Sequence, residues 1–166
     1  MGKGKECLAE ESAGAVIEKY SNMVYRLAYA RTGSRHDADD IYQEVFLRYF
    51  RRKPVFDSEE HRKAWLHRVT VNCSNSFLSA PWQRRTMGLP EDLPYEGGSK
   101  DHLDLHSKLQ MLPAKYRGVI HLFYYEELSV EEIDRILHRK PSTVRTQLVR
   151  ARQRLARILK EEDYAF

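Results

Sequence analysis

Apolar residues recur at intervals of three and four through the first half of the chain, which is the spacing of amphipathic helices. Three such runs lie between residues 16 and 77. Gly33 predicts the end of the first helix, Ser34 can cap the second, Pro54 ends it, and the third begins near Ser58. The predicted buried faces consist of Val16, Ile17, Tyr20, Met23, Val24, Leu27 and Ala28, of Ala38, Ile41, Tyr42, Val45, Phe46, Tyr49 and Phe50, and of Trp65, Leu66, Val69, Cys73 and Phe77. Three helices of this kind can close one small core.

The helical spacing lapses after residue 80, where prolines, glycines and a serine punctuate the chain. Neither a helical nor a strand period is present between residues 81 and 100. The segment is too short for a further domain and is predicted to be a flexible linker. We therefore expect an all-α protein with two small helical domains, residues 1–80 and 105–166, joined by a linker over residues 81–104.

The helical spacing resumes at Leu105, and Pro113 can open the next helix as its first residue. Ser129 and Glu132 form the pattern of a capping box ahead of another short helix. Pro141 breaks that helix, and Ser142 is a candidate cap for the last one. A short helix, a tight turn and a longer basic helix together predict a helix-turn-helix.

The last helix carries the candidate nucleic-acid chemistry. Between Arg135 and Lys160 there are nine Lys or Arg residues and no acid, in a chain of net charge +4. Such a stripe favours a polyanion, although a solvated helix face is the plainer alternative. Arg145, Thr146 and Gln147 lie off the apolar stripe near the start of the helix and are candidates for base contacts. Arg150, Arg152 and Arg154 follow and suit phosphate contacts.

The second helix shows the opposite charge. Its first half carries Asp37, Asp39, Asp40 and Glu44 beside a wide apolar face. An acidic and aromatic surface of this kind suits docking onto a basic protein surface. Ordinary acidity at a helix start explains the same residues equally well.

Other classes of protein find little support in the sequence. No apolar run approaches the length of a membrane span, and residues 1–11 lack the apolar core of a signal peptide, so a cytoplasmic protein without membrane insertion is expected. The two cysteines share no motif. Phosphate loops, nucleophile elbows and zinc helices are absent, so we expect no catalysis, no metal and no cofactor. His102 and His106, four residues apart, leave a metal-dependent enzyme as a weak alternative.

The order of these pieces resembles a known family. Asp37-Ala38-Asp39-Asp40-Ile41-Tyr42-Gln43-Glu44-Val45-Phe46 is similar to the acidic motif of region 2 of bacterial RNA polymerase sigma factors, and Ala64-Trp65-Leu66 through Asn72 resembles the helix that follows it. Leu112-Pro113 through Arg117, then Ser129 to Leu155, resembles region 4. The resemblance covers about 130 residues, and its two regions around a short linker resemble the extracytoplasmic-function group of the sigma-70 family.

The resemblance implies which molecules the protein binds and which residues contact them. Region 2 would bind the RNA polymerase core enzyme through Asp39, Asp40, Gln43, Glu44 and Phe46, and would open the promoter −10 element with Arg62, Lys63, Arg68, Asn72 and Asn75. Region 4 would read the −35 element with Arg139, Ser142, Thr143, Arg145, Thr146, Gln147, Arg150 and Arg152. Family members are usually held inactive by an anti-sigma protein, so such a partner is expected.

The chain departs from the family pattern at the helix-turn-helix turn. His138 and Arg139 stand where relatives often have glycine and an apolar residue, so Arg139 is a candidate for DNA contact. Asp57, Glu59 and Glu60 place acid beside the −10 surface. The rival interpretation is a stand-alone helix-turn-helix regulator whose N-terminal half senses a ligand or dimerises.

Overall fold

The computed structural model describes residues 11–79, 105 and 107–163 of the chain. These residues form helices and turns without a strand, which confirms the all-α prediction. The element order is α1 (Ala13–Thr32), α2 (Arg35–Arg52), α3 (Glu59–Ser79), α5 (Ala114–Ile120), the π-helix η2 (His121–Tyr125), α6 (Val130–Leu137) and α7 (Pro141–Asp163). The predicted linker, residues 81–104, lies outside the described residues.

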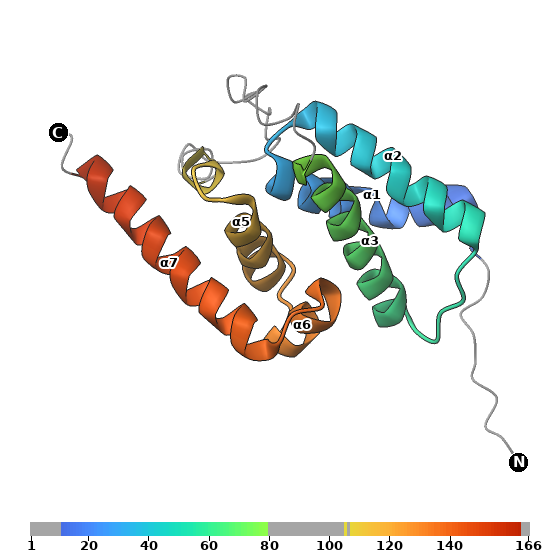
Figure 1. Cartoon of the computed structure of the whole chain (residues 1–166). Coiled ribbons are helices and arrows are strands. Elements are labelled where there is room, and N and C mark those ends of the chain that lie inside the picture. The colour runs from blue at the N-terminus through green and yellow to red at the C-terminus, as the bar shows by residue number, and fades with distance from the viewer. Residues whose placement is uncertain (1–10, 80–104, 106, 164–166) are drawn as a thin grey trace, which may run out of the picture.

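Helices α1, α2 and α3 form an N-terminal bundle (Figure 1). Its core is the one that the apolar spacing predicts, with Val24, Ala28, Ile41 and Leu66 completely buried. The boundaries also follow the sequence: the Ser34 hydroxyl accepts a hydrogen bond from the Asp37 amide, and Gly33 adopts the left-handed conformation that ends α1. Cys73 is buried, as expected.

Helices α5, α6 and α7 form a C-terminal bundle in which two boundaries differ from the prediction. Helix α7 begins at Pro141, so Ser142 lies within its first turn and is not its cap. Proline suits this place because the first turn of a helix leaves its amides without intrahelical partners. Pro113 precedes α5 as its N-cap residue instead of opening it. The capping box of Ser129 and Glu132 is confirmed.

The turn between α6 and α7 spans residues 138–140 and completes the helix-turn-helix. His138 adopts φ 53° there, in the left-handed region. Glycine enters this region at no steric cost, whereas a side chain is strained in it. The turn position at which the resemblance implies glycine adopts the left-handed conformation in this chain with a histidine.

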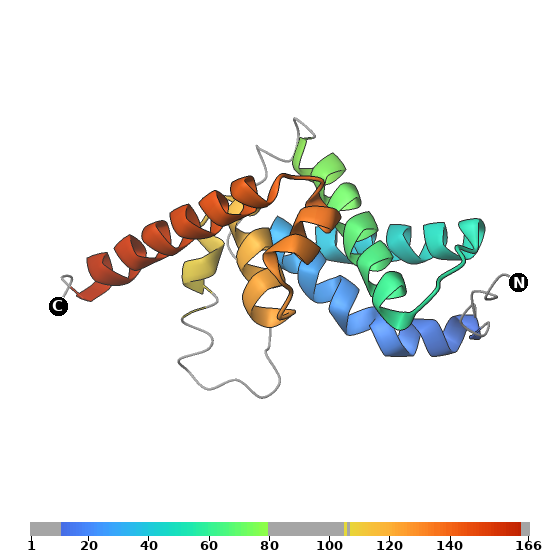
Figure 2. The same cartoon turned by 90° about the horizontal axis from the view of Figure 1, so that it is seen from below.

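The two bundles pack against one another. Helix α5 lies between α7 and α1, and α6 contacts α3 (Figures 1 and 2). A shared apolar cluster joins them: Leu27 of α1 and Val71 of α3 are buried with Val119, Leu122 and Ile133 of the C-terminal bundle. This packing sets the relative position of all the candidate site residues.

Candidate nucleic-acid and protein interfaces

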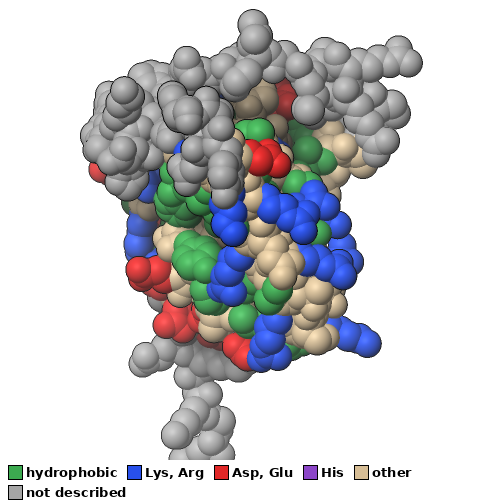
Figure 3. Space-filling model, turned by 90° about the vertical axis from the view of Figure 1, so that its left-hand side faces the viewer, with side chains coloured by type: hydrophobic (Ala, Val, Ile, Leu, Met, Phe, Trp, Pro, Cys, Tyr) green, Lys and Arg blue, Asp and Glu red, His purple; other side chains and the backbone are tan. Residues whose placement is uncertain are grey.

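The first half of α7 borders an open groove of about 240 Å³. Five of the predicted −35 residues line it, namely Ser142, Thr143, Thr146, Gln147 and Arg150, together with Lys115 and Tyr116 of α5. Hydroxyls, an amide and cations are the groups that contact base edges and phosphates. Lys and Arg side chains also spread over the face of the molecule on the α7 side, with acids towards its margins (Figure 3).

Two further predicted −35 residues lie on another flank of α7 and contact their own bundle. Arg152 donates a hydrogen bond to the Tyr124 hydroxyl at 2.6 Å and lies over the rings of Phe123 and Tyr124. Arg145 pairs with Glu131 of α6 at 3.4 Å, and both side chains are exposed. An exposed pair of this kind contributes little to stability, so the Arg145 guanidinium is available to another anion.

Helix α3 presents part of the predicted −10 set on one face. Arg68, Asn72 and Asn75 are exposed and follow one another at intervals of four and three residues, which places them on a single helical face. Lys63 is exposed too, but its position in the helical period differs from theirs. The face of Arg68 and Asn75 is turned towards the C-terminal bundle, because Arg68 lies 3.4 Å from His138.

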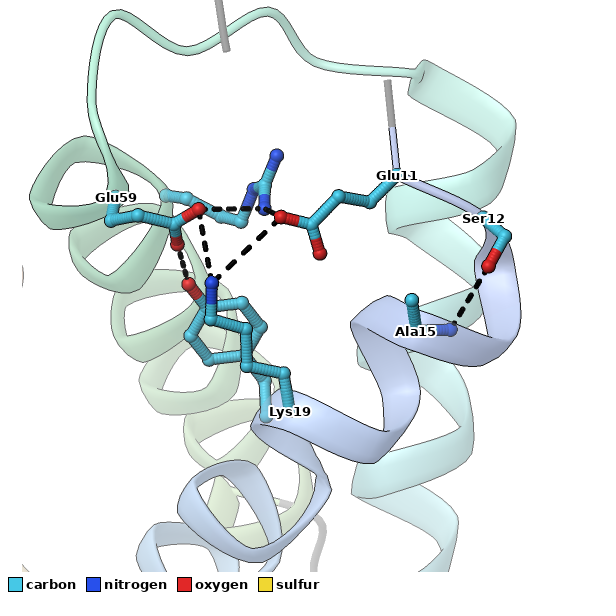
Figure 4. Close-up of polar contacts among 7 residues, drawn as sticks. Glu11, Ser12, Ala15, Lys19 and Glu59 are labelled. Atoms are coloured by element: carbon cyan, nitrogen blue, oxygen red, sulfur yellow. Dashed lines mark hydrogen bonds and ion pairs between the residues drawn. The ribbon is translucent and has the colours of Figure 1, made fainter. Parts of the chain in front are cut away.

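Arg62 is placed differently from the rest of its set. Its side chain is 3% exposed and pairs with Glu11 at 3.1 Å and Glu59 at 3.2 Å (Figure 4). Lys19 also pairs with Glu59, and the Tyr20 hydroxyl donates to the same carboxylate. That hydrogen bond lowers the pKa of Glu59 and outweighs the effect of its burial. Arg62 therefore joins α3 to Glu11, which lies two residues before α1. Its burial differs from the exposed position that a DNA contact requires.

The acidic residues of α2 form an exposed face. Asp39, Asp40 and Gln43 are exposed, and Glu44 accepts a hydrogen bond from Arg48 at 2.8 Å. Phe46, by contrast, is 4% exposed and belongs to the core of the N-terminal bundle. Its ring lies 5.0 Å from that of Tyr42. Phe46 can therefore support a protein contact only by positioning its neighbours and not by touching the partner itself.

Two further residues belong to these surfaces and were not predicted from the sequence. Leu47 is 46% exposed and follows Gln43 by four residues on the same face of α2. The sequence did carry a signal for this residue, because Leu47 lies outside the apolar stripe of its helix. Lys115 borders the α7 groove from another helix, so only the packing of α5 on α7 reveals it.

The structure supplies no support for a metal centre among the described residues, where no group of three His, Cys, Asp or Glu side chains is arranged to hold an ion. His102 and His106, the pair behind the enzyme alternative, lie outside the described residues. None of the described helices is long and apolar enough to cross a membrane.

Comparison with known proteins identifies the family. The family descriptions "Sigma-70 region 2" and "Sigma-70, region 4" match residues 16–83 and 102–155, respectively. The chain is 30% identical to the ECF RNA polymerase sigma factor SigW of Bacillus subtilis (strain 168), over 92% of this chain and 91% of that protein. It is 34% identical to the ECF RNA polymerase sigma factor SigE of Mycolicibacterium smegmatis, over 84% of this chain but only 58% of that relative's length.

Two solved structures share the fold. One is the sigma factor RpoE in complex with the anti-sigma factor NepR from Bartonella quintana, with a TM-score of 0.74, 22% identity, and coverage of 89% of this chain and 96% of that one. The other is CnrH in complex with the cytosolic domain of CnrY, with a TM-score of 0.64, 20% identity, and coverage of 90% and 88%. With the sequence matches, these place the chain in the extracytoplasmic-function group of RNA polymerase sigma factors.

Proposed function

We propose that this chain is a promoter-specificity subunit with no catalysis of its own. Residues 1–80 bind the RNA polymerase core enzyme and open the −10 element, residues 81–104 connect the two parts, and residues 105–166 read the −35 element. The protein acts in the cytoplasm, where RNA polymerase transcribes. An anti-sigma protein is a further partner, in keeping with the two complexes that share its fold.

One observation carries the proposal: two surfaces of opposite charge lie on the two matched regions. The acidic face of α2, with Asp39 and Asp40, is exposed on the N-terminal bundle. The groove that the cations Lys115 and Arg150 line lies on the C-terminal bundle. A protein that contacts both a basic protein surface and DNA needs two separate surfaces of this kind.

The test of the polymerase contact is binding to purified core enzyme. We expect the double variant Asp40→Ala and Glu44→Ala to bind core enzyme at least about tenfold more weakly, because charge complementarity governs such association. Glu18→Ala with Glu161→Ala is the matched control, since it removes two exposed acids outside α2. Equal loss in both variants would show a net-charge effect and contradict the assigned surface.

The test of promoter recognition is transcription in vitro with core enzyme over a promoter library. Arg145→Ala is expected to weaken promoter selection by about 1–3 kcal/mol and to relax preference at one base pair. Arg26→Ala, an exposed arginine of α1, is the control. Tight duplex binding without any polymerase-dependent transcription would instead identify a stand-alone helix-turn-helix regulator.

A further inference from the structure

Arg152 of α7 is held in place by two aromatic residues of the π-helix η2. Its Nε donates a hydrogen bond to the Tyr124 hydroxyl at 2.6 Å. The guanidinium carbon lies 5.6 Å from the centroid of the Phe123 ring and 5.5 Å from that of the Tyr124 ring. The two rings meet edge to face with their centroids 5.0 Å apart, so the guanidinium contacts both rings at once. The orientation of Arg152 is therefore set by η2, which lies well before α7 in the chain.

The Arg152 side chain is exposed on the surface of α7. Within the described part of the chain, neither of its Nη atoms has a hydrogen-bond partner and no carboxylate pairs with it. Arg145 differs, because Glu131 pairs with it at 3.4 Å. Arg152 is thus a cation whose orientation is fixed and whose outer N–H groups are available to a bound anion.

Tyr124 is exposed at the surface although it makes this contact. The exposed fraction is 51% for Tyr124 and 57% for Tyr125, whereas Leu122 is completely buried. The π-helix η2 thus presents two consecutive tyrosines to solvent beside α7. Short π-helices occur frequently at functional sites. Burial in the core does not account for Tyr124, so its contact with Arg152 is what distinguishes this residue.

A DNA phosphate is the anion that this arrangement fits best. Arg145, Val149 and Arg152 follow one another at intervals of four and three residues, which places them on one flank of α7. This flank belongs to the stretch from Arg135 to Lys160, which holds nine Lys or Arg residues and no acid. Such a stretch attracts a polyanion with closely spaced charges. A guanidinium presents its N–H groups in a rigid plane that matches two oxygens of a phosphate.

We propose that Arg152 is a phosphate-binding residue of the DNA interface and that Phe123 and Tyr124 of η2 complete this site, with Tyr124 as its positioning residue. The proposal rests on the proposed function, because it takes DNA as the ligand of α7. Tyr124 acts through Arg152: its hydroxyl and ring hold the guanidinium in one orientation, so less side-chain freedom is lost when a phosphate binds. The DNA interface thereby extends to η2, which precedes the helix-turn-helix in the chain.

The salt dependence of binding separates the role of Arg152 from that of Tyr124. Each phosphate that a cation neutralises steepens the fall of log K with log salt by about 0.9. Arg152→Ala removes the cation, so the slope should become shallower by about 0.9. Tyr124→Phe leaves the cation in place, so binding should weaken without a change in the slope.

The experiment measures binding of the full chain to a short random-sequence DNA duplex over a series of salt concentrations. The unaltered chain is expected to bind at low salt. Tyr124→Phe is expected to bind about two- to tenfold more weakly, as the loss of one hydrogen bond predicts. Arg152→Lys should also bind more weakly with an unchanged slope, since lysine keeps the charge but not the planar fork. Tyr125→Phe is the matched control and should bind like the unaltered chain, because the ring of this exposed tyrosine stacks on His121 instead.

A double variant tests whether Tyr124 acts through Arg152. In an Arg152→Ala background, Tyr124→Phe is expected to weaken binding no further, because the group that it positions is gone. An equal further loss in that background would overturn the positioning role. An unchanged slope in Arg152→Ala, or no binding by the unaltered chain at low salt, would overturn the phosphate site.

The duplex measurements do not involve core enzyme, so they separate this proposal from the proposed function. Failure of the chain to bind polymerase would refute the proposed function and leave the phosphate site standing in a DNA-binding protein of another kind. If Arg152→Ala and Tyr124→Phe weaken binding to core enzyme but bind the duplex like the unaltered chain, the site contacts an acidic protein surface, and the proposal is overturned.

Discussion

The two bundles are built differently although both consist of three main helices. The N-terminal bundle has helices of 20, 18 and 21 residues and an aromatic-rich core of its own. The C-terminal bundle has one helix of 23 residues, while α5 and α6 have only 7 and 8 residues. Part of its apolar cluster is Leu27 and Val71, which belong to the other bundle.

The difference shows that the bundles do not depend on one another equally. Tyr20, Val24, Ile41 and Leu66 would stay buried within the N-terminal bundle if the two parts separated, because all four pack within that bundle. The C-terminal cluster would lose two of its buried side chains on separation. We therefore expect the packing between the bundles to stabilise the C-terminal bundle more than the N-terminal one, because stability can differ from one part of a structure to another.

The largest expected effect comes from a pair of leucines, both completely buried. Leu66→Ala is expected to destabilise the N-terminal bundle by about 2–5 kcal/mol, as large-to-small changes in cores do. Leu27→Ala removes the same atoms from α1 but is expected to increase amide hydrogen exchange mainly in α5 and α6. Hydrogen exchange read helix by helix separates the two outcomes. Greater exchange in α2 than in α6 after Leu27→Ala would contradict the asymmetry.

Most of the fold was predictable because local patterns and tertiary packing agree in it. The apolar faces of α1, α2 and α3, the caps at Ser34 and Ser129 and the stop at Gly33 all follow from spacing and residue type. The π-helix η2 was not predictable, since its extra residue per turn leaves no mark in a short apolar run. The packing of one bundle on the other was not predictable either, because each contact joins residues distant in the sequence.

The candidate site was predictable in its surface residues and less so in its buried ones. Thr146, Gln147 and Arg150 lie off the apolar stripe of α7 and line the groove. Arg62 and Phe46 are in motif positions but buried, because Glu11 and Glu59 surround the first and Tyr42 packs on the second. A motif specifies a position along the chain, whereas burial depends on side chains contributed by other elements.

A smaller effect is expected at Glu126, which contacts both bundles. Burial would raise the pKa of its carboxyl, but the contacts with His121 and His67 lower it to about 2. A carboxyl with a lowered pKa contributes stability that is fully present above the pKa of the unfolded chain, about 4.3, and is lost as the pH falls towards 2. Glu126→Gln should therefore cost about 1–3 kcal/mol at pH 7 and flatten the decline in stability between pH 4.5 and 2.

The matched control for this change is Glu127→Gln, since the adjacent glutamate is exposed. Urea unfolding at a series of pH values measures both variants. The same loss of stability in Glu126→Gln at pH 7 and at pH 2 would show that the lost interaction does not involve the ionised carboxyl. That result would show that the charge of Glu126 does not stabilise the contact between the two bundles.

The smallest effect is expected at the capping box of α6. The Ser129 hydroxyl accepts a hydrogen bond from the Glu132 amide at 3.1 Å, and the Glu132 carboxylate accepts one from the Ser129 amide at 2.8 Å. Ser129→Ala should cost about 0.5–2 kcal/mol, as the loss of an N-cap does. The effect should concentrate in α6, because a helix of 8 residues has few other hydrogen bonds to keep it together.

Ser34→Ala removes the equivalent cap from the 18-residue helix α2. The other helical hydrogen bonds of α2 should limit the increase in amide hydrogen exchange to its first turn. Exchange confined to the first turn in both helices would mean that the short helix is held by its packing on α3 and α7 and not by its cap.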